Sequence, residues 1–244
     1  MFFFFYIIAG KEIFALIGTI ANAAAICAGS FLGSKLKQGI GAHYKAILMD
    51  AMGLAATVLG IRSAVLAMPD SQLPVLFIVS LAAGGLIGTR LQLADAFERL
   101  VSKFPGQSDL AQGLSTAILL FCAGTLSILG PMQSALQGDH TYLFTNAILD
   151  GITSIVLSST FGFGIAAAAG VLFCWQGGIY LLARFIEPWI TAPLLTELSI
   201  VGGILILSSG LNILNLKKFE TLNLLPALAV PAIVVPIATQ LGLI

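Results

Sequence analysis

The chain has 244 residues, of which 58% are hydrophobic and only 9% are charged, and its formal net charge is zero. Soluble domains usually carry about a quarter charged residues, so this inventory cannot cover a water-facing surface. The neutral balance also excludes the basic field that holds nucleic acid. The composition therefore predicts an integral membrane protein whose main partner is the lipid bilayer.

A transmembrane helix needs about 20 mostly apolar residues, and the sequence supplies eight segments of this kind. They are 13–34, 46–67, 73–91, 113–135, 142–162, 165–185, 194–215 and 222–243. The fifth and sixth are separated only by a tight FGFG turn; if that turn does not form, one of them is re-entrant and the count is seven. We predict an all-α membrane bundle of about eight helices, with 1–244 as one transmembrane domain and 1–17 as a lead-in.

Basic residues predict the orientation, because Lys and Arg are enriched in cytoplasmic connections. Eight of the 11 lie in alternate connections: Lys35, Lys37, Lys45, Arg90, Arg99, Lys103, Lys217 and Lys218. The connections at 68–72 and 136–141 carry none. We therefore expect both termini outside. The segment 91–104 has apolar and charged residues on opposite helical faces and is expected to be a cytoplasmic interfacial helix.

A short motif occurs twice, as CAGS at 27–30 and CAGT at 122–125. Each copy is followed by a Leu-Gly pair, a polar loop and an apolar span with one aspartate, Asp50 or Asp150. On the predicted topology this is an inverted repeat of spans 1–3 and 4–6, an arrangement common in secondary transporters. Chance similarity between small-residue apolar segments is the other interpretation.

Asp150 is the strongest candidate site residue, because a charge at a helix centre costs about 2.5–3.5 kcal/mol on insertion scales. Asn146, Thr153 and Ser154 share its helical face, so an amide, a carboxylate and two hydroxyls converge. Such oxygen ligands suit a small cation or a proton relay. The alternative is that Asp150 only hydrogen-bonds a neighbouring helix. Asp50, one turn into the second span, is a weaker candidate of the same kind.

Arg62 and Glu197 have similar expected depth and opposite sign, which predicts an ion pair. With only His43 and His140 in the chain, no multi-histidine metal site is expected, and the identity of any metal is left open. We also expect no cofactor. No enzymatic motif is found, although Asp139 and His140 leave a lipid-acting enzyme open.

Four segments carry a resemblance to a known family. They are IGTIANAAAICAGSFLG, LLFCAGTLSILGPMQSALQGDHTYLFTNAILDGITSIVLSSTFGFG, ELSIVGGILILSSGLNIL and NLLPAL. They resemble domain of unknown function 554, the YdfK/YqgA-like membrane proteins, over nearly the whole chain from Gly18 onward. The resemblance implies a multi-pass protein of the bacterial plasma membrane, and it supplies neither a substrate nor functional residues.

Two functions remain open from the sequence. The first is a transporter or channel for a small ion or solute, with a polar intramembrane site around Asp150. The second is a structural or scaffolding membrane protein, including a homo-oligomer assembled through glycine-rich faces, in which the intramembrane carboxylates only pack.

Overall fold

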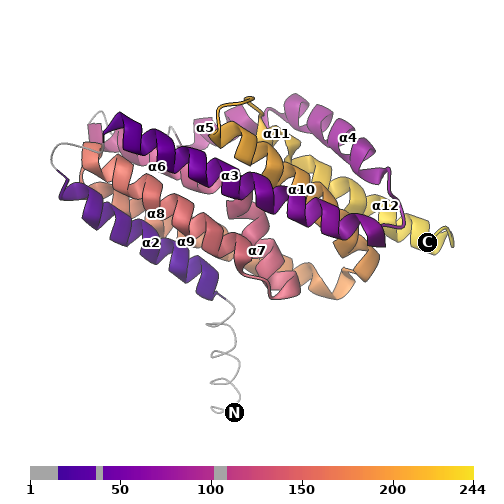
Figure 1. The fold of residues 1–244 in the computed structure, drawn as a ribbon. Helices are drawn as coiled ribbons and strands as arrows, with labels where there is room; N and C mark the ends of the chain where they lie inside the picture. Colours follow the sequence, from indigo (N-terminus) through magenta and orange to yellow (C-terminus); the bar gives the residue numbers. More distant parts are fainter. Residues whose placement is uncertain (1–15, 37–40, 102–108) are drawn as a thin grey trace, which may run out of the picture. The chain divides into compact units, whose positions relative to one another are not determined.

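The computed structural model describes residues 16–36, 41–101 and 109–244, and within these ranges the regular secondary structure is entirely helical (Figure 1). The predicted all-α bundle is confirmed. Most of the predicted lead-in at 1–17 and the end of the predicted interfacial helix lie outside the described residues. So does Lys37.

Within the part of the chain that the structure describes, six helical segments are long and apolar enough to cross a membrane. They are Ile17–Ser34, Ala46–Asp70, Thr141–Phe161, Phe163–Trp189, Ala192–Ile213 and Thr221–Gln240. A seventh is the pair Thr116–Cys122 and Thr125–Gln137, which is bent by 43° at its break. The predicted third span contains a shorter apolar helix, Leu76–Leu91. Length and composition thus qualify six segments, or seven with the bent pair, and the count of eight stays a prediction.

The chain folds as two compact units, each made from two stretches of sequence. Unit 1 comprises 1–45 and 101–188, and unit 2 comprises 46–100 and 189–244. Predicted spans 1, 4, 5 and 6 fall in unit 1, and spans 2, 3, 7 and 8 fall in unit 2. The division therefore cuts across the predicted repeat of spans 1–3 and 4–6, which stays a prediction.

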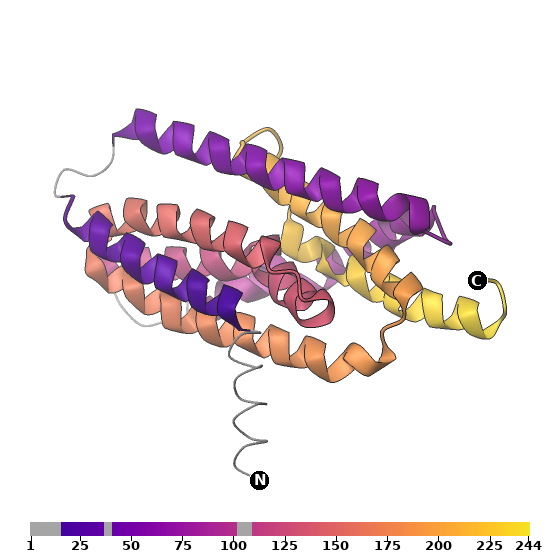
Figure 2. The same cartoon turned by 60° about the horizontal axis from the view of Figure 1, so that its bottom comes forward.

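Unit 1 is built around the pairing of α2 (Ile17–Ser34) with α8 (Thr141–Phe161), which lie side by side in Figures 1 and 2. The two helices run parallel, because Gly18 lies against Leu143 and Gly33 lies against Ile155. A Cβ atom on Gly29 would overlap the carbonyl oxygen of Gly151. Small residues thus let the two backbones approach closely, as in other membrane helix pairs.

The remaining helices of unit 1 are α6 (Asp109–Ala123), α7 (Thr125–Gln137) and α9 (Ala168–Ile186). The α6 and α7 segments are separated at Gly124, whose backbone is extended with ψ 138°. A three-residue turn returns the chain from α7 into α8, so these helices are antiparallel. The α9 helix runs parallel to α7 and contacts it through Tyr180, Ala183 and Ala135.

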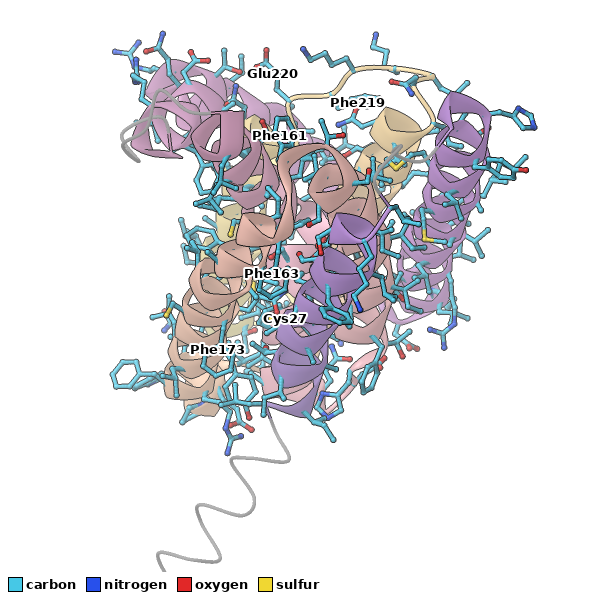
Figure 3. All side chains as sticks on the ribbon, turned by 90° about the vertical axis from the view of Figure 1, so that its left-hand side faces the viewer. Cys27, Phe161, Phe163, Phe173, Phe219 and Glu220 are labelled. Atoms are coloured by element: carbon cyan, nitrogen blue, oxygen red, sulfur yellow. The ribbon has the colours of Figure 1, made fainter. Side chains whose placement is uncertain are left out.

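The turn between α8 and α9 forms as a distinct break. Gly162 has φ 85° and ψ −179°, a conformation that only glycine adopts readily, and a 3₁₀ segment, Phe163–Ala167, follows it. Figure 3 shows Phe161 and Phe163 on either side of this turn. The fifth and sixth predicted spans are therefore two separate apolar helices.

Unit 2 contains most of α3 (Ala42–Ala67), together with α4 (Leu76–Leu91) and α10 (Ala192–Ile213). The unit begins at Ala46, within the second turn of α3. Its last apolar segment is divided into α11 (Thr221–Leu224), a 3₁₀ turn (Leu225–Leu228) and α12 (Ala229–Gln240). The α3 and α10 helices are antiparallel, with Gly53 against Leu214 and Gly60 against Leu207.

The α4 helix packs antiparallel to the divided segment. Cβ atoms on Gly84 and Gly88 would overlap the backbone of Ala227 and Asn223, so glycine is required at both positions. The α4 helix ends at Leu91, the next residue Gln92 is left-handed with φ 51°, and α5 (Leu93–Val101) begins directly after Gln92. The predicted interfacial segment is thus a helix distinct from the span before it, and its position at the membrane surface stays a prediction.

Candidate functional site

Buried polar side chains follow one face of α2 and one face of α8, the two helices joined by the hydrogen bond from Asn22 to Asp150. Spacings of three and eight residues on α2, and of four residues on α8, keep the side chains of each helix on one side of it. We call this set the α2–α8 polar seam. It consists of Thr19, Asn22 and Ser30 on α2, and Asn146, Asp150, Ser154 and Ser158 on α8, all of them buried. The seam lies wholly within unit 1.

Asp150 is at the centre of α8 and is only 5% exposed. Its Oδ2 atom accepts two amide hydrogen bonds of 2.9 Å, one from Asn146 on the same helix and one from Asn22 on α2. Because a carboxylate only accepts, these bonds fix which end of each amide faces it. The Oδ1 atom of Asn22 therefore takes no part in the bond to Asp150.

Several oxygen atoms of the seam have no hydrogen-bond partner although they are buried. These are Asn22 Oδ1, Thr19 Oγ1, Ser30 Oγ, Ser154 Oγ and Ser158 Oγ. Hydroxyls in other helices of the chain bond back to a carbonyl in the preceding turn; examples are Thr57 to Gly53 and Ser80 to Leu76. An unpaired buried polar group costs about 1–3 kcal/mol, so the concentration of such groups in one seam requires a functional or structural explanation.

The broken helix α6–α7 adjoins the seam. Both of its segments pack against α8, the helix that carries Asp150. On the α7 side of the break at Gly124, Ser127 accepts a bond of 3.3 Å from Gln176 of α9. A break leaves the last carbonyls of one helix segment and the first N–H groups of the next without intrahelical partners. Such discontinuous helices form the ion and substrate sites of many transporters.

The sequence-predicted site residues separate into two groups. Asp150, Asn146 and Ser154 belong to the seam, and Thr153 is half-buried beside it. Asp50 is exposed on α3 and belongs to unit 2. Sequence reasoning missed Thr19, Asn22 and Ser30; the available signal was their spacing as isolated polar residues in an otherwise apolar span.

The predicted pair of Arg62 and Glu197 is not formed. Arg62 is exposed, whereas Glu197 is 2% exposed and uses Oε1 to accept from the Ser71 hydroxyl at 2.5 Å and the Leu73 N–H at 3.3 Å. Its Oε2 atom has no partner. The prediction assumed that opposite charges at similar depth pair with each other. In the structure, two residues of the loop after α3 donate hydrogen bonds to the Glu197 carboxylate instead.

The Gly138-Asp139-His140 turn has local roles. Gly138 ends α7 in a left-handed conformation with φ 67°. Asp139 accepts from the Thr141 N–H at 2.9 Å, and His140 Nδ1 lies 2.8 Å from the Ser134 hydroxyl. Each residue therefore contributes to closing the connection between α7 and α8, and lipid-directed chemistry here stays untested.

The apolar helices, the close glycine contacts and the buried seam define a polytopic α-helical membrane protein. Its sequence matches the profile of the family described as "Protein of unknown function (DUF554)" over residues 17–236, and the chain belongs to that family. The chain is 59% identical to "Uncharacterized membrane protein YdfK" of Bacillus subtilis (strain 168) over 228 residues, which are 93% of this chain and 99% of that protein.

A more distant relative is "Uncharacterized protein YqgA" of Escherichia coli (strain K12). It is 30% identical over 223 residues, covering 87% of this chain and 93% of the relative. No solved structure matches the chain. The resemblance inferred from the sequence is thus confirmed, and neither relative carries a named substrate.

Proposed function

We propose that the protein is a transporter or channel for a small ion or solute, with its polar site in the α2–α8 polar seam around Asp150. The observation that carries this proposal is a buried carboxylate at the centre of an apolar helix, in a seam that also holds buried oxygen atoms without partners. Ionisable groups at this depth are expensive and commonly mark ion or proton pathways. The adjoining break at Gly124 supports the same conclusion.

The proposal includes eight membrane crossings in a bacterial plasma membrane, with both termini outside. Helix directions support it: in unit 1, α2 and α8 run opposite to α7 and α9, as odd and even spans must. In unit 2, α3 opposes α10, and α4 opposes the last segment. The 16 residues of α4 give about 24 Å, which a bilayer core of about 30 Å accommodates by local thinning.

Flux measurements in liposomes reconstituted with the full chain test this function. The Asp150→Asn variant keeps the shape of the side chain and removes its charge, so we expect flux to fall to the level of empty liposomes. The Asp70→Asn variant, at an exposed position in the loop after α3, is the matched control and should retain flux. Normal flux through Asp150→Asn would remove Asp150 from the pathway.

The competing function is structural, and the pair of hydrogen bonds from Asn22 and Asn146 to Asp150 is the observation that favours it. Polar bonds of this type join membrane helices without any transport role. Under that function, Asp150→Asn lowers thermal stability while no ion or solute is conducted by the unaltered protein.

A further inference from the structure

The α2–α8 polar seam contains several buried oxygen atoms that no hydrogen-bond donor satisfies. Its two amides already donate to Asp150, and the Asn22 Oδ1 atom that remains is fully buried and without a partner. Thr19 lies one turn before Asn22 on the same face of α2, and Ser154 lies one turn after Asp150 on α8. The hydroxyl oxygens of Thr19 and Ser154 are also buried and have no hydrogen-bond partner. The Asn22 amide oxygen can be satisfied only by a hydrogen-bond donor or a cation, and the two hydroxyl oxygens can bind the same partner.

The charge of the seam restricts that partner further. Its residues include one carboxylate and no Lys, Arg or His, so an anion would meet the carboxylate charge with no positive side chain to offset it. A divalent cation would keep an uncompensated charge in a low-dielectric interior. Across the described ranges there is no group of three or more acidic, His or Cys side chains, the set that divalent and transition metals usually require. A single positive charge matches the single carboxylate.

A proton and a metal cation both carry one positive charge, but they need different surroundings. A proton is held by one carboxylate oxygen and leaves the Asn22 amide oxygen and the Thr19 hydroxyl still without partners. A dehydrated alkali-metal cation is held by several neutral oxygens together with one charge.

We propose that the α2–α8 polar seam binds a dehydrated monovalent metal cation of the size of Na⁺. Asp150 supplies the charge, the Asn22 amide oxygen is a direct ligand, and the Thr19 and Ser154 hydroxyls complete the oxygen set. This names the ligand class of the seam and rests on the proposed function only for its physiological use. Binding itself is measurable without any transport assay.

The test is thermal unfolding of the purified full chain in detergent, at constant ionic strength, with choline chloride replaced stepwise by NaCl, LiCl or KCl. A ligand that binds only the folded state raises Tm in a saturable way. We expect this rise with NaCl and not with choline chloride. Asp150→Asn should abolish it. Thr19→Val, which keeps the shape and removes only the hydroxyl, should raise the apparent Kd for Na⁺ by about tenfold or more.

The matched control is Ser80→Ala. Ser80 is a buried hydroxyl in unit 2 that already bonds to the Leu76 carbonyl at 2.8 Å, so its removal should leave the Kd for Na⁺ unchanged. The proposal is overturned if NaCl and choline chloride give the same Tm. It is also overturned if the Na⁺ effect survives both Asp150→Asn and Thr19→Val, or if only pH shifts Tm through Asp150, which would identify a proton site.

These outcomes separate binding from transport. Saturable Na⁺ binding without flux of any ion would retain the cation site and reject the proposed transporter. Asp150-dependent flux of another solute, with no Na⁺ effect on Tm, would retain the transporter and reject the cation site.

Discussion

Replacing Asn22 by Ala is expected to weaken the junction of α2 and α8, because Asn22 is the α2 residue that donates to Asp150. Hydrogen bonds between membrane helices contribute about 0.6 kcal/mol on average and about 1.7 kcal/mol at most in double-mutant cycles. In this site Asn146 continues to donate to the same oxygen at 2.9 Å, so the carboxylate is not left without a partner. We therefore expect a coupling energy between Asn22 and Asp150 of about 1 kcal/mol.

The assay is a cycle of Asn22→Ala, Asp150→Ala and the double variant, with the free energy of unfolding measured by denaturant titration in mixed micelles. Choline chloride is the only salt, so that cation binding does not contribute. Asn22→Ala combined with Ser159→Ala is the control, because Ser159 lies nine residues beyond Asp150 and bonds only to Val156 of its own helix. That pair should be additive within about 0.5 kcal/mol. An Asn22–Asp150 coupling no larger than this control would refute the proposed hydrogen-bonded junction.

Two further predictions concern packing and topology. Gly33→Val should destabilise the protein by about 1–3 kcal/mol through overpacking, since a Cβ there overlaps the backbone of Ile155. A Cβ on Gly178 meets no atom within 4 Å, and alanine favours a helix more than glycine does, so Gly178→Ala should not lower the melting temperature. A Gly33→Val variant that melts no lower than the unaltered protein would contradict the α2–α8 contact. In a background without native cysteines, His43→Cys and Asp139→Cys should react with an impermeant maleimide from opposite sides of the membrane, and labelling from one side would contradict the orientation.

Local sequence decided that the chain forms membrane helices. Apolar segments of bilayer length have few alternatives in lipid, since every backbone N–H and C=O must be paired within the segment. Local sequence also identified Asp150 as a candidate site residue, because the cost of burying a carboxylate depends on its depth in a single helix. Asn146 and Ser154 followed from helical periodicity alone.

Tertiary structure decided which helices meet. Asn22 lies 128 residues from Asp150, and the sequence contains nothing that pairs spans 1 and 5. Glu197 likewise accepts hydrogen bonds from Ser71 and Leu73 and does not pair with Arg62. The path of the loop after α3 decides these contacts, and it cannot be read from the sequence of one helix. The repeated motif is the clearest case. CAGS continues as helix in α2, where Gly29 packs on Gly151, whereas CAGT breaks at Gly124. Four nearly identical residues thus take two different conformations, so the motif alone does not determine its structure.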